Sequence, residues 1–401
     1  MPHRYADPVK RPAGWLGQQR GHRAKPIEWL IEKGIFLVSL WVIALVFLLF
    51  LFVGREALPI FLGRANSAAM QESLPVGELN RLLKEEPERL RRYLDVKTGQ
   101  FEKLRVEAGH ETLKILMQVK EEEAREAPKD QDARLNTTTW RYLLGAHQWS
   151  GYDKPEYIWQ PISQIHKYNI VPLFLGSLKT TAVALLFAVP IALGAAIFVS
   201  QLGPARLKEW LKPAIELLAG IPSVVLGFFA LIVMATLLQK LFGYQSRLNA
   251  FVAGIALGIA VIPVIFSIAE DAITSVPRAY TQAALALGAT RWEATWQVVL
   301  PAALPGVFAA VVLGFGRAIG ETMVVLMASG NASIVSSSLF DSTRTITATI
   351  AAELAEAVFG GHHYRVLFML GTLLFAVTFC SNAVAGAVIH SLKQKLEGKL
   401  R

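Results

Sequence analysis

The chain has 401 residues, of which 53% are hydrophobic and only 18% are charged. Its apolar residues gather in runs of about 20, a length that crosses a membrane, which excludes an ordinary soluble protein. The formal net charge is +9, but residues 54–170 contain 18 Lys and Arg against 18 Asp and Glu. The surplus therefore belongs to the apolar part and its short flanks, which argues against nucleic-acid binding. The single cysteine, Cys380, excludes a disulfide framework and a cysteine-based metal site.

The first element is a charge-free apolar run at residues 35–53, which follows a basic N-terminal tail at residues 1–34. Such a pattern is typical of a cleaved targeting signal or of a retained signal-anchor helix. The run is longer than the core of most signal peptides, so we expect a retained first transmembrane helix.

Residues 54–170 separate this run from the remaining apolar runs, and we expect them to form a partly helical, extracytoplasmic insertion. Leu79, Leu82, Leu83 and Leu90 recur at helical spacing, as do Leu113, Leu116 and Met117. A small solvated helical domain explains the pattern, and a docking surface for a soluble partner is the alternative.

Five further apolar runs follow within a predicted core at residues 171–390, and each is long enough to cross a hydrocarbon layer of about 30 Å. They lie at about Thr180–Val199, Ala214–Leu238, Ala250–Ile268, Gly306–Ala328 and Val366–Ile389. The sequence therefore predicts an all-α polytopic membrane protein with six transmembrane helices.

The orientation follows from the positive residues of the short loops. Segments 1–34, 200–213, 269–304 and 390–401 contain 16 Lys and Arg, whereas loops 239–249 and 329–365 contain 4. Because Lys and Arg gather on the cytoplasmic side, we expect both termini, including the tail at residues 391–401, in the cytoplasm. The protein is then a multi-pass protein of the cell membrane, or of the inner membrane in a Gram-negative cell.

The predicted cytoplasmic loop 269–304 contains the stretch QAALALGATRWEATWQVVLP at residues 282–301. Its spacing resembles the coupling motif of ABC-importer permeases, in which Glu-Ala-Ala is followed by Gly and then by a hydrophobic residue and Leu-Pro. The positions that match or align with the motif are Gln282, Ala283, Ala284, Gly288, Val298, Leu300 and Pro301. Gln282 replaces the glutamate of the family, which puts an ion pair at that position in doubt. A plain amphipathic loop helix is the alternative.

Three other stretches resemble the phosphate-uptake permeases of that family. They are YNIVPLFLGSLKTT at 168–181, ELLAGIPSVVLG at 216–227 and GRAIGETM at 316–323. The resemblance covers roughly residues 150–390 and implies a type I ABC-importer permease core that imports inorganic phosphate. It also implies ABC ATPase subunits, a second permease subunit and an extracytoplasmic phosphate-binding protein as partners, besides membrane lipid.

Two other functions stay open at this point. Sulfate and molybdate permeases have a similar motif, but Thr322 and Met323 after Glu321 favour phosphate. A membrane-anchored scaffold or sensor built on residues 54–170 is the second alternative, which the coupling motif disfavours. The chain has no Gly-x-x-x-x-Gly-Lys-Ser/Thr loop, so we expect no catalytic residue, no cofactor and no metal in this chain and ATP hydrolysis by separate subunits.

Two charged residues lie in the apolar run 306–328, namely Arg317 and Glu321. Four positions apart, they are expected to share one face of a helix. A charge inside a membrane is costly, so we expect both to face the bundle interior and, with Thr322, to line the substrate pathway. A guanidinium offers paired planar donors to phosphate oxygens. A structural ion pair that joins two helices is the alternative. At the outer side we expect Lys179 to extend toward the membrane interface.

Overall fold

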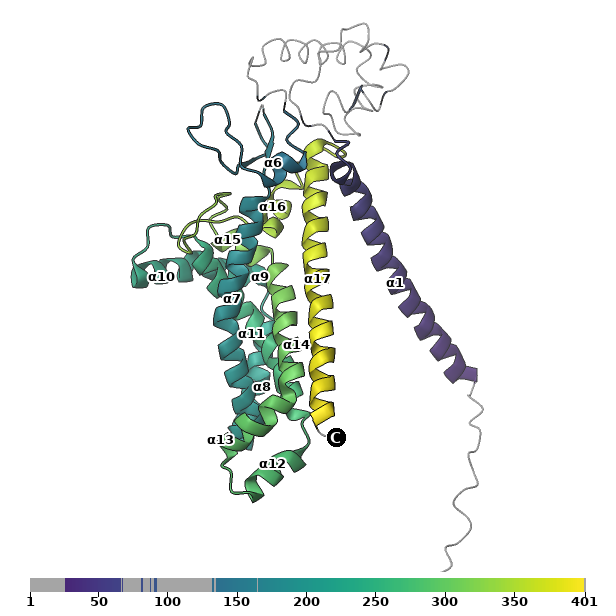
Figure 1. The fold of residues 1–401 in the computed structure, drawn as a ribbon, viewed down its shortest axis with the longest axis vertical. Coiled ribbons are helices and arrows are strands. Elements are labelled where there is room, and N and C mark those ends of the chain that lie inside the picture. Colours follow the sequence, from purple (N-terminus) through teal and green to yellow (C-terminus); the bar gives the residue numbers. More distant parts are fainter. Residues whose placement is uncertain are drawn as a thin grey trace, which may run out of the picture. The chain divides into compact units, whose positions relative to one another are not determined.

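The computed structural model describes residues 26–65, 67, 81, 87, 90, 91, 132, 135–163 and 165–399. The chain forms two units, Met1–Phe52 and Val53–Arg401. The described residues are mostly helical, as predicted, and contain one short two-stranded sheet (Figure 1). Most residues of the helices that the sequence predicts between Leu79 and Met117 lie outside the described residues.

The apolar run at residues 35–53 lies within helix α1, Pro26–Phe61. This helix continues without a break past the predicted end of the run at residue 53. Its last turns belong to the second unit, where Ala57 and Ile60 are buried. That α1 crosses the membrane stays a prediction.

Five helical segments of the second unit are long and apolar enough to cross a membrane, with mean hydropathy between 1.9 and 2.6. They confirm the five runs predicted after residue 170, although several boundaries differ. The segments are Val171–Leu202, Ser223–Phe242, Ala250–Thr274, Arg291–Ile319 and His362–Ser391.

These segments correspond to individual elements of the fold. Their main helices are α7 (Val171–Ile197), α9 (Ser223–Phe229), α10 (Ala235–Phe242), α11 (Ala250–Thr274), α14 (Leu300–Ile319) and α17 (His362–Lys399). Short π-helical turns extend or connect them at Phe198–Leu202, Ala230–Met234 and Thr295–Val299.

Helix α11 lies at the centre of the bundle, where it packs against α7 on one side and α14 on the other, while α14 also packs against α17. Gly254 and Gly314 permit this close packing. A Cβ at Gly254 would lie 2.5 Å from Val183, and a Cβ at Gly314 would lie 2.5 Å from the Ile265 side chain. Both distances are far below a van der Waals contact, so a side chain at either position would force the neighbouring residue to shift.

The predicted run Ala214–Leu238 is wrong at its start. Residues Ala205–Ala219 form a separate amphipathic helix, α8, and the membrane segment begins only at Ser223. Pro222 explains the break, because its ring and missing N–H interrupt helical hydrogen bonding and its neighbour Ile221 is pushed away from helical geometry.

The predicted run Gly306–Ala328 is wrong at its end. Helix α14 stops at Ile319, Gly320 caps it, and a separate short helix, α15 (Met323–Ala328), follows. Glycine is a poor helix former, so the chain can leave the helix at Gly320. Because of this break, Arg317 lies within α14 and Glu321 lies beyond its end.

The predicted outer side also contains ordered structure. Helices α6 (Trp140–Leu144) and α16 (Ile346–Glu353) lie there with strands β1 (Trp159–Gln160) and β2 (Lys167–Tyr168), which pair antiparallel. A second apolar cluster joins them to the start of α17. Its members include Leu143, Trp159, Tyr168, Leu173, Ile346, Val366 and Leu370. The described end of the 54–170 segment therefore packs on α16 and α17.

Candidate functional site

The predicted coupling stretch forms two short helices that join α11 to α14. Gln282, Ala283 and Ala284 lie on the first of them, α12 (Arg278–Ala286), which has no buried residue. Gly288 follows with a φ of +92°, a conformation that L side chains rarely adopt. The chain therefore turns sharply at this glycine, between α12 and α13.

The rest of the coupling stretch leads directly into the membrane. Thr290 and Glu293 form a capping box that begins the second helix, α13 (Arg291–Ala294). The π-helical turn Thr295–Val299 continues directly into α14, which begins with Leu300 and Pro301. The Leu-Pro pair therefore lies at the change from π-helix to α-helix within the segment Arg291–Ile319.

Exposed apolar side chains surround this loop, and the sequence pattern did not single them out. Leu287 is 90% exposed beside the Gly288 turn. Trp292 and Trp296 stack at 5.8 Å between ring centroids and are both exposed. Apolar groups of this size at a loop tip are typical of a surface that a partner or the membrane interface covers.

An ion pair fixes α8 beside the last turns of α11, on the side that the sequence predicts to be cytoplasmic. Lys212 Nζ lies 2.7 Å from Glu270 Oε2 and 3.5 Å from Asp271 Oδ1. Glu270 is only 3% exposed and also accepts a hydrogen bond from Thr274. The hydrogen bond to Glu270 raises the pKa of Lys212, with the charges of Glu270 and Asp271 adding to it against partial desolvation.

Arg317 lies in the last turn of α14 and lines a hollow of about 510 Å³ between α14 and α17. It is exposed to this hollow, and it forms no ion pair with a carboxylate among the residues that the structure describes. A guanidinium with free donors on an otherwise apolar helix can bind an oxyanion through two oxygens.

Glu321 does not share a helix face with Arg317, so that prediction is wrong. The helix ends between them, and the Glu321 carboxylate accepts a hydrogen bond from the backbone N–H of Thr322 at 3.1 Å. The main-chain oxygen of Glu321 accepts a second one from Thr347 Oγ1 at 2.8 Å. Glycine at position 320 causes the difference, because it ends α14 one residue before Glu321.

Thr322 lines a different hollow, of about 430 Å³, beside α16. The other residues of this hollow are Thr347, Ile350, Ala351, Leu354 and Ala355. Arg317 and Thr322, both predicted for the pathway, therefore border two separate hollows, and Glu321 lines neither of them.

Lys179 is bonded within the protein, and its extension toward the membrane interface stays a prediction. Its Nζ donates hydrogen bonds to the main-chain oxygens of Ser336 and Ser338, at 2.5 Å and 3.0 Å. The backbone of the 329–345 loop supplies these acceptors, so the lysine holds this loop against α7.

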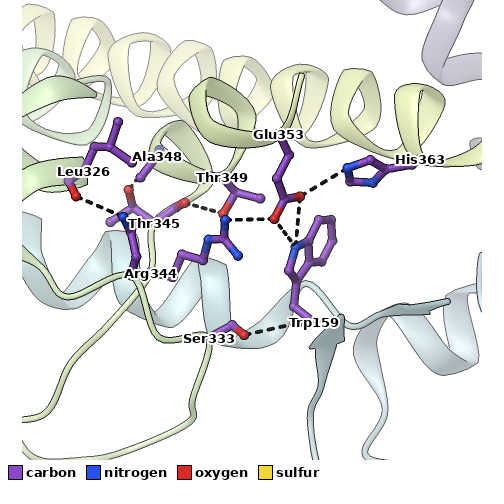
Figure 2. A network of polar contacts seen from close by, with 10 residues as sticks. Trp159, Leu326, Ser333, Arg344, Thr345, Ala348, Thr349, Glu353 and His363 are labelled. Carbon is purple, nitrogen blue, oxygen red and sulfur yellow. Dashed lines mark hydrogen bonds and ion pairs between the residues drawn. The ribbon is translucent and has the colours of Figure 1, made fainter. Parts of the chain in front are cut away.

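A buried polar cluster on the predicted outer side was not apparent from the sequence (Figure 2). The Glu353 carboxylate forms an ion pair with Arg344 at 2.8 Å and lies 3.3 Å from His363 Nε2. Trp159 Nε1 donates to both carboxylate oxygens, at 3.1 Å and 3.2 Å. Trp159 lies 194 residues before Glu353 in the sequence, so no short motif reveals the cluster. No group of three or more potential metal ligands occurs within the described ranges.

Comparisons with known proteins show which family the chain resembles. A family described as the inner membrane component of binding-protein-dependent transport systems matches residues 188–394. The chain is 38% identical to the phosphate transport system permease protein PstC of Mesorhizobium japonicum over 246 residues, which cover 57% of this chain and 74% of that protein. It is 36% identical to PstC of Haemophilus influenzae, covering 60% of this chain and 81% of that one. A probable ABC transporter permease of Bacillus subtilis is 36% identical, covering 55% of this chain and 72% of the relative.

Among solved structures, a chain of the MetNI methionine ABC transporter in an inward-facing conformation aligns with a TM-score of 0.44 at 18% identity. The alignment covers 54% of this chain and 93% of that chain. The family match and the relatives identify the chain as a transport component and not an ATPase, as predicted. The chain belongs to the binding-protein-dependent transport-system inner membrane components and is a multi-pass protein of the inner membrane.

Proposed function

We propose that this chain is the transmembrane permease subunit of an ATP-driven importer of inorganic phosphate. The exposed coupling loop carries the proposal. Helix α12 buries no residue against its own chain, and Gly288 turns the chain sharply beside the exposed Leu287. A loop with this form is suited to insert into a groove of a separate ATPase subunit.

Phosphate is the transported anion in this proposal. The relatives from Mesorhizobium and Haemophilus are named phosphate transport permeases, and the residues Gly-Arg-Ala-Ile-Gly-Glu-Thr-Met occur here at 316–323. Arg317 offers planar paired donors within a membrane helix, which suits a tetrahedral oxyanion. Glu321 and Thr322 lie just beyond the helix end, and Thr322 lines the second hollow.

The wider architecture follows from this function. We infer six transmembrane helices, formed by α1 and the five apolar segments, in a type I importer core with both termini in the cytoplasm. Residues 54–170 then lie outside the cytoplasm, where a phosphate-binding protein delivers the anion. A second permease subunit completes the pathway, and ATPase subunits dock on the 282–301 loop.

Purification of the complex from its native membrane tests the proposal. We expect ATPase subunits and a second permease to copurify, and the complex in vesicles to accumulate radiolabelled phosphate only with ATP and the binding protein. Sulfate or molybdate offered with their own binding proteins serve as controls. Accumulation of one of these anions instead of phosphate would reject the proposed substrate, and the absence of any ATPase would reject the importer itself.

A further inference from the structure

Helices α14 and α17 lie side by side (Figure 1) and enclose the hollow that Arg317 lines. Each helix contributes one continuous face, because the lining residues recur every three or four positions. On α14 these residues are Leu313, Gly316, Arg317 and Gly320, and on α17 they are Gly371, Leu374, Phe375, Thr378 and Asn382. The hollow is thus mostly apolar, with three polar side chains.

The three polar side chains differ in whether their polar atoms already form hydrogen bonds within the protein. The Thr378 hydroxyl donates to the main-chain oxygen of Phe375 at 2.9 Å. The Asn382 amide forms no hydrogen bond with any described residue and is exposed to the hollow. Arg317, on the facing helix, also lacks an ion pair within that part of the chain. Asn382 and Arg317 are therefore the two lining residues whose polar groups remain available for hydrogen bonds to a ligand.

The two helices place these groups at a similar level. A Cβ on Gly316, the neighbour of Arg317, would lie 4.0 Å from Asn382 Oδ1. At ~1.5 Å per residue, Asn382 lies about 14 Å from Ser391 at the end of its apolar segment, roughly half of a ~30 Å hydrocarbon layer. An unbonded amide is costly at that depth, so it requires a polar partner.

We infer that Asn382 is a second contact for the transported anion and binds it together with Arg317 across this hollow. The inference rests on the proposed phosphate import. The guanidinium donates to two phosphate oxygens, and the Asn382 Nδ2 group donates to a third. The Asn382 Oδ1 atom accepts the hydrogen of the P–OH group of a protonated phosphate. Sulfate is fully ionised near neutral pH and has no such hydrogen, so Asn382 favours phosphate.

The test uses the complete transporter, reconstituted in vesicles with saturating phosphate-loaded binding protein. The measured quantity is the amount of phosphate moved per ATP hydrolysed, together with the amount of assembled complex. Asn382→Leu removes both hydrogen-bonding groups at similar size, and Asn382→Asp keeps the acceptor but adds a negative charge. Thr372→Val is the matched control, because the Thr372 hydroxyl lies on the same helix, outside the hollow, and already donates to Phe368.

We expect Asn382→Leu to lower phosphate moved per ATP about tenfold or more, the usual effect of losing a hydrogen bond to a charged group. Asn382→Asp should lower it more at mildly alkaline than at mildly acidic pH, because phosphate carries more negative charge at higher pH. Thr372→Val should retain the wild-type ratio and the wild-type amount of complex.

Two results would overturn the inference. An unchanged ratio in both Asn382 variants with normal assembly would show that the amide does not contact the anion. Reduced assembly with an unchanged ratio would show that Asn382 contacts protein instead. Failure of the wild-type complex to move phosphate would reject the proposed function. Because the wild type is measured in parallel, this failure is distinguished from a failure of the Asn382 inference.

Discussion

Arg344 Nη2 and Glu353 Oε1 lie 2.8 Å apart, and their side chains are only 17% and 9% exposed. Arg344 precedes α16, Glu353 ends it, and Trp159 from strand β1 donates to the same carboxylate. Through its hydrogen bond with Trp159, the Glu353 carboxylate joins the end of the 54–170 segment to the region between α15 and α17. Because the carboxylate is bonded on both oxygens, its removal leaves several donors without an acceptor.

Glu353→Gln should destabilise the folded protein by about 3–5 kcal/mol, the typical effect of leaving one buried charge unpaired. The midpoint of thermal unfolding in detergent measures this effect. Glu356→Gln is the control, since Glu356 is exposed three residues away. The double variant Arg344→Met with Glu353→Leu should recover part of the loss, because no charge is then left unpaired. Equal midpoints for Glu353→Gln and the control would contradict this account.

The ion pair of Lys212 should make the stability of the folded protein depend on pH. Its folded-state pKa is raised, chiefly by the hydrogen bond to Glu270, whereas an unfolded lysine has a pKa of about 10.4. The ion pair therefore stabilises the folded protein fully when the pH is below the pKa of the unfolded lysine. This stabilisation is lost as the pH rises through the higher pKa of the folded state. The difference in unfolding midpoint between wild type and Lys212→Gln should be constant near neutral pH and shrink in strong alkali.

Lys240→Gln serves as the control for this measurement, because Lys240 is exposed and forms no ion pair with a described residue. Its difference from the wild type should stay small at every pH. A difference for Lys212→Gln that grows with rising pH would have the wrong sign and would refute the assignment.

The turn at Gly288 was predictable because its signal is local: a glycine permits a left-handed conformation whatever the distant packing. That this loop couples to an ATPase stays a prediction. The end of α14 was predictable in principle, since three glycines occur between Gly314 and Gly320, but the apolar residues beyond them concealed the break. Asn382 and the Glu353 cluster were not predictable, because only tertiary packing brings α17 beside α14 and Trp159 beside α16.

Gly288→Leu should reduce ATP-driven uptake strongly while the chain still inserts in the membrane. A side chain at a φ of +92° is strained by roughly 1–2 kcal/mol and changes the turn that positions α12. Uptake and ATP hydrolysis in vesicles measure the coupling. Gly151→Leu is the matched control, because Gly151 has a φ of +85° and equally open surroundings but lies in the predicted extracytoplasmic segment. Normal uptake by Gly288→Leu would exclude this loop as the coupling element.

Reporter fusions test the inferred topology. A reporter fused after residue 100 should report a location outside the cytoplasm, and one fused after Arg401 should report the cytoplasm, since the positive loop residues favour this orientation. Truncation after Phe61 with a reporter attached isolates α1 and asks whether that helix alone crosses the membrane. A cytoplasmic signal at residue 100 would remove α1 from the six inferred spans.

The last prediction separates an anion contact from a structural pair at Arg317. Because Arg317 and Glu321 lie on either side of the end of α14, exchanging them (Arg317→Glu with Glu321→Arg) should not restore transport, whereas a structural pair would tolerate the exchange. Arg317→Lys should impair uptake about tenfold or more despite its charge, because an ammonium lacks the paired planar donors. Phosphate uptake is measured beside the amount of chain in the membrane. Full uptake by the exchanged protein would show that the two side chains act only on each other, and that the anion binds elsewhere.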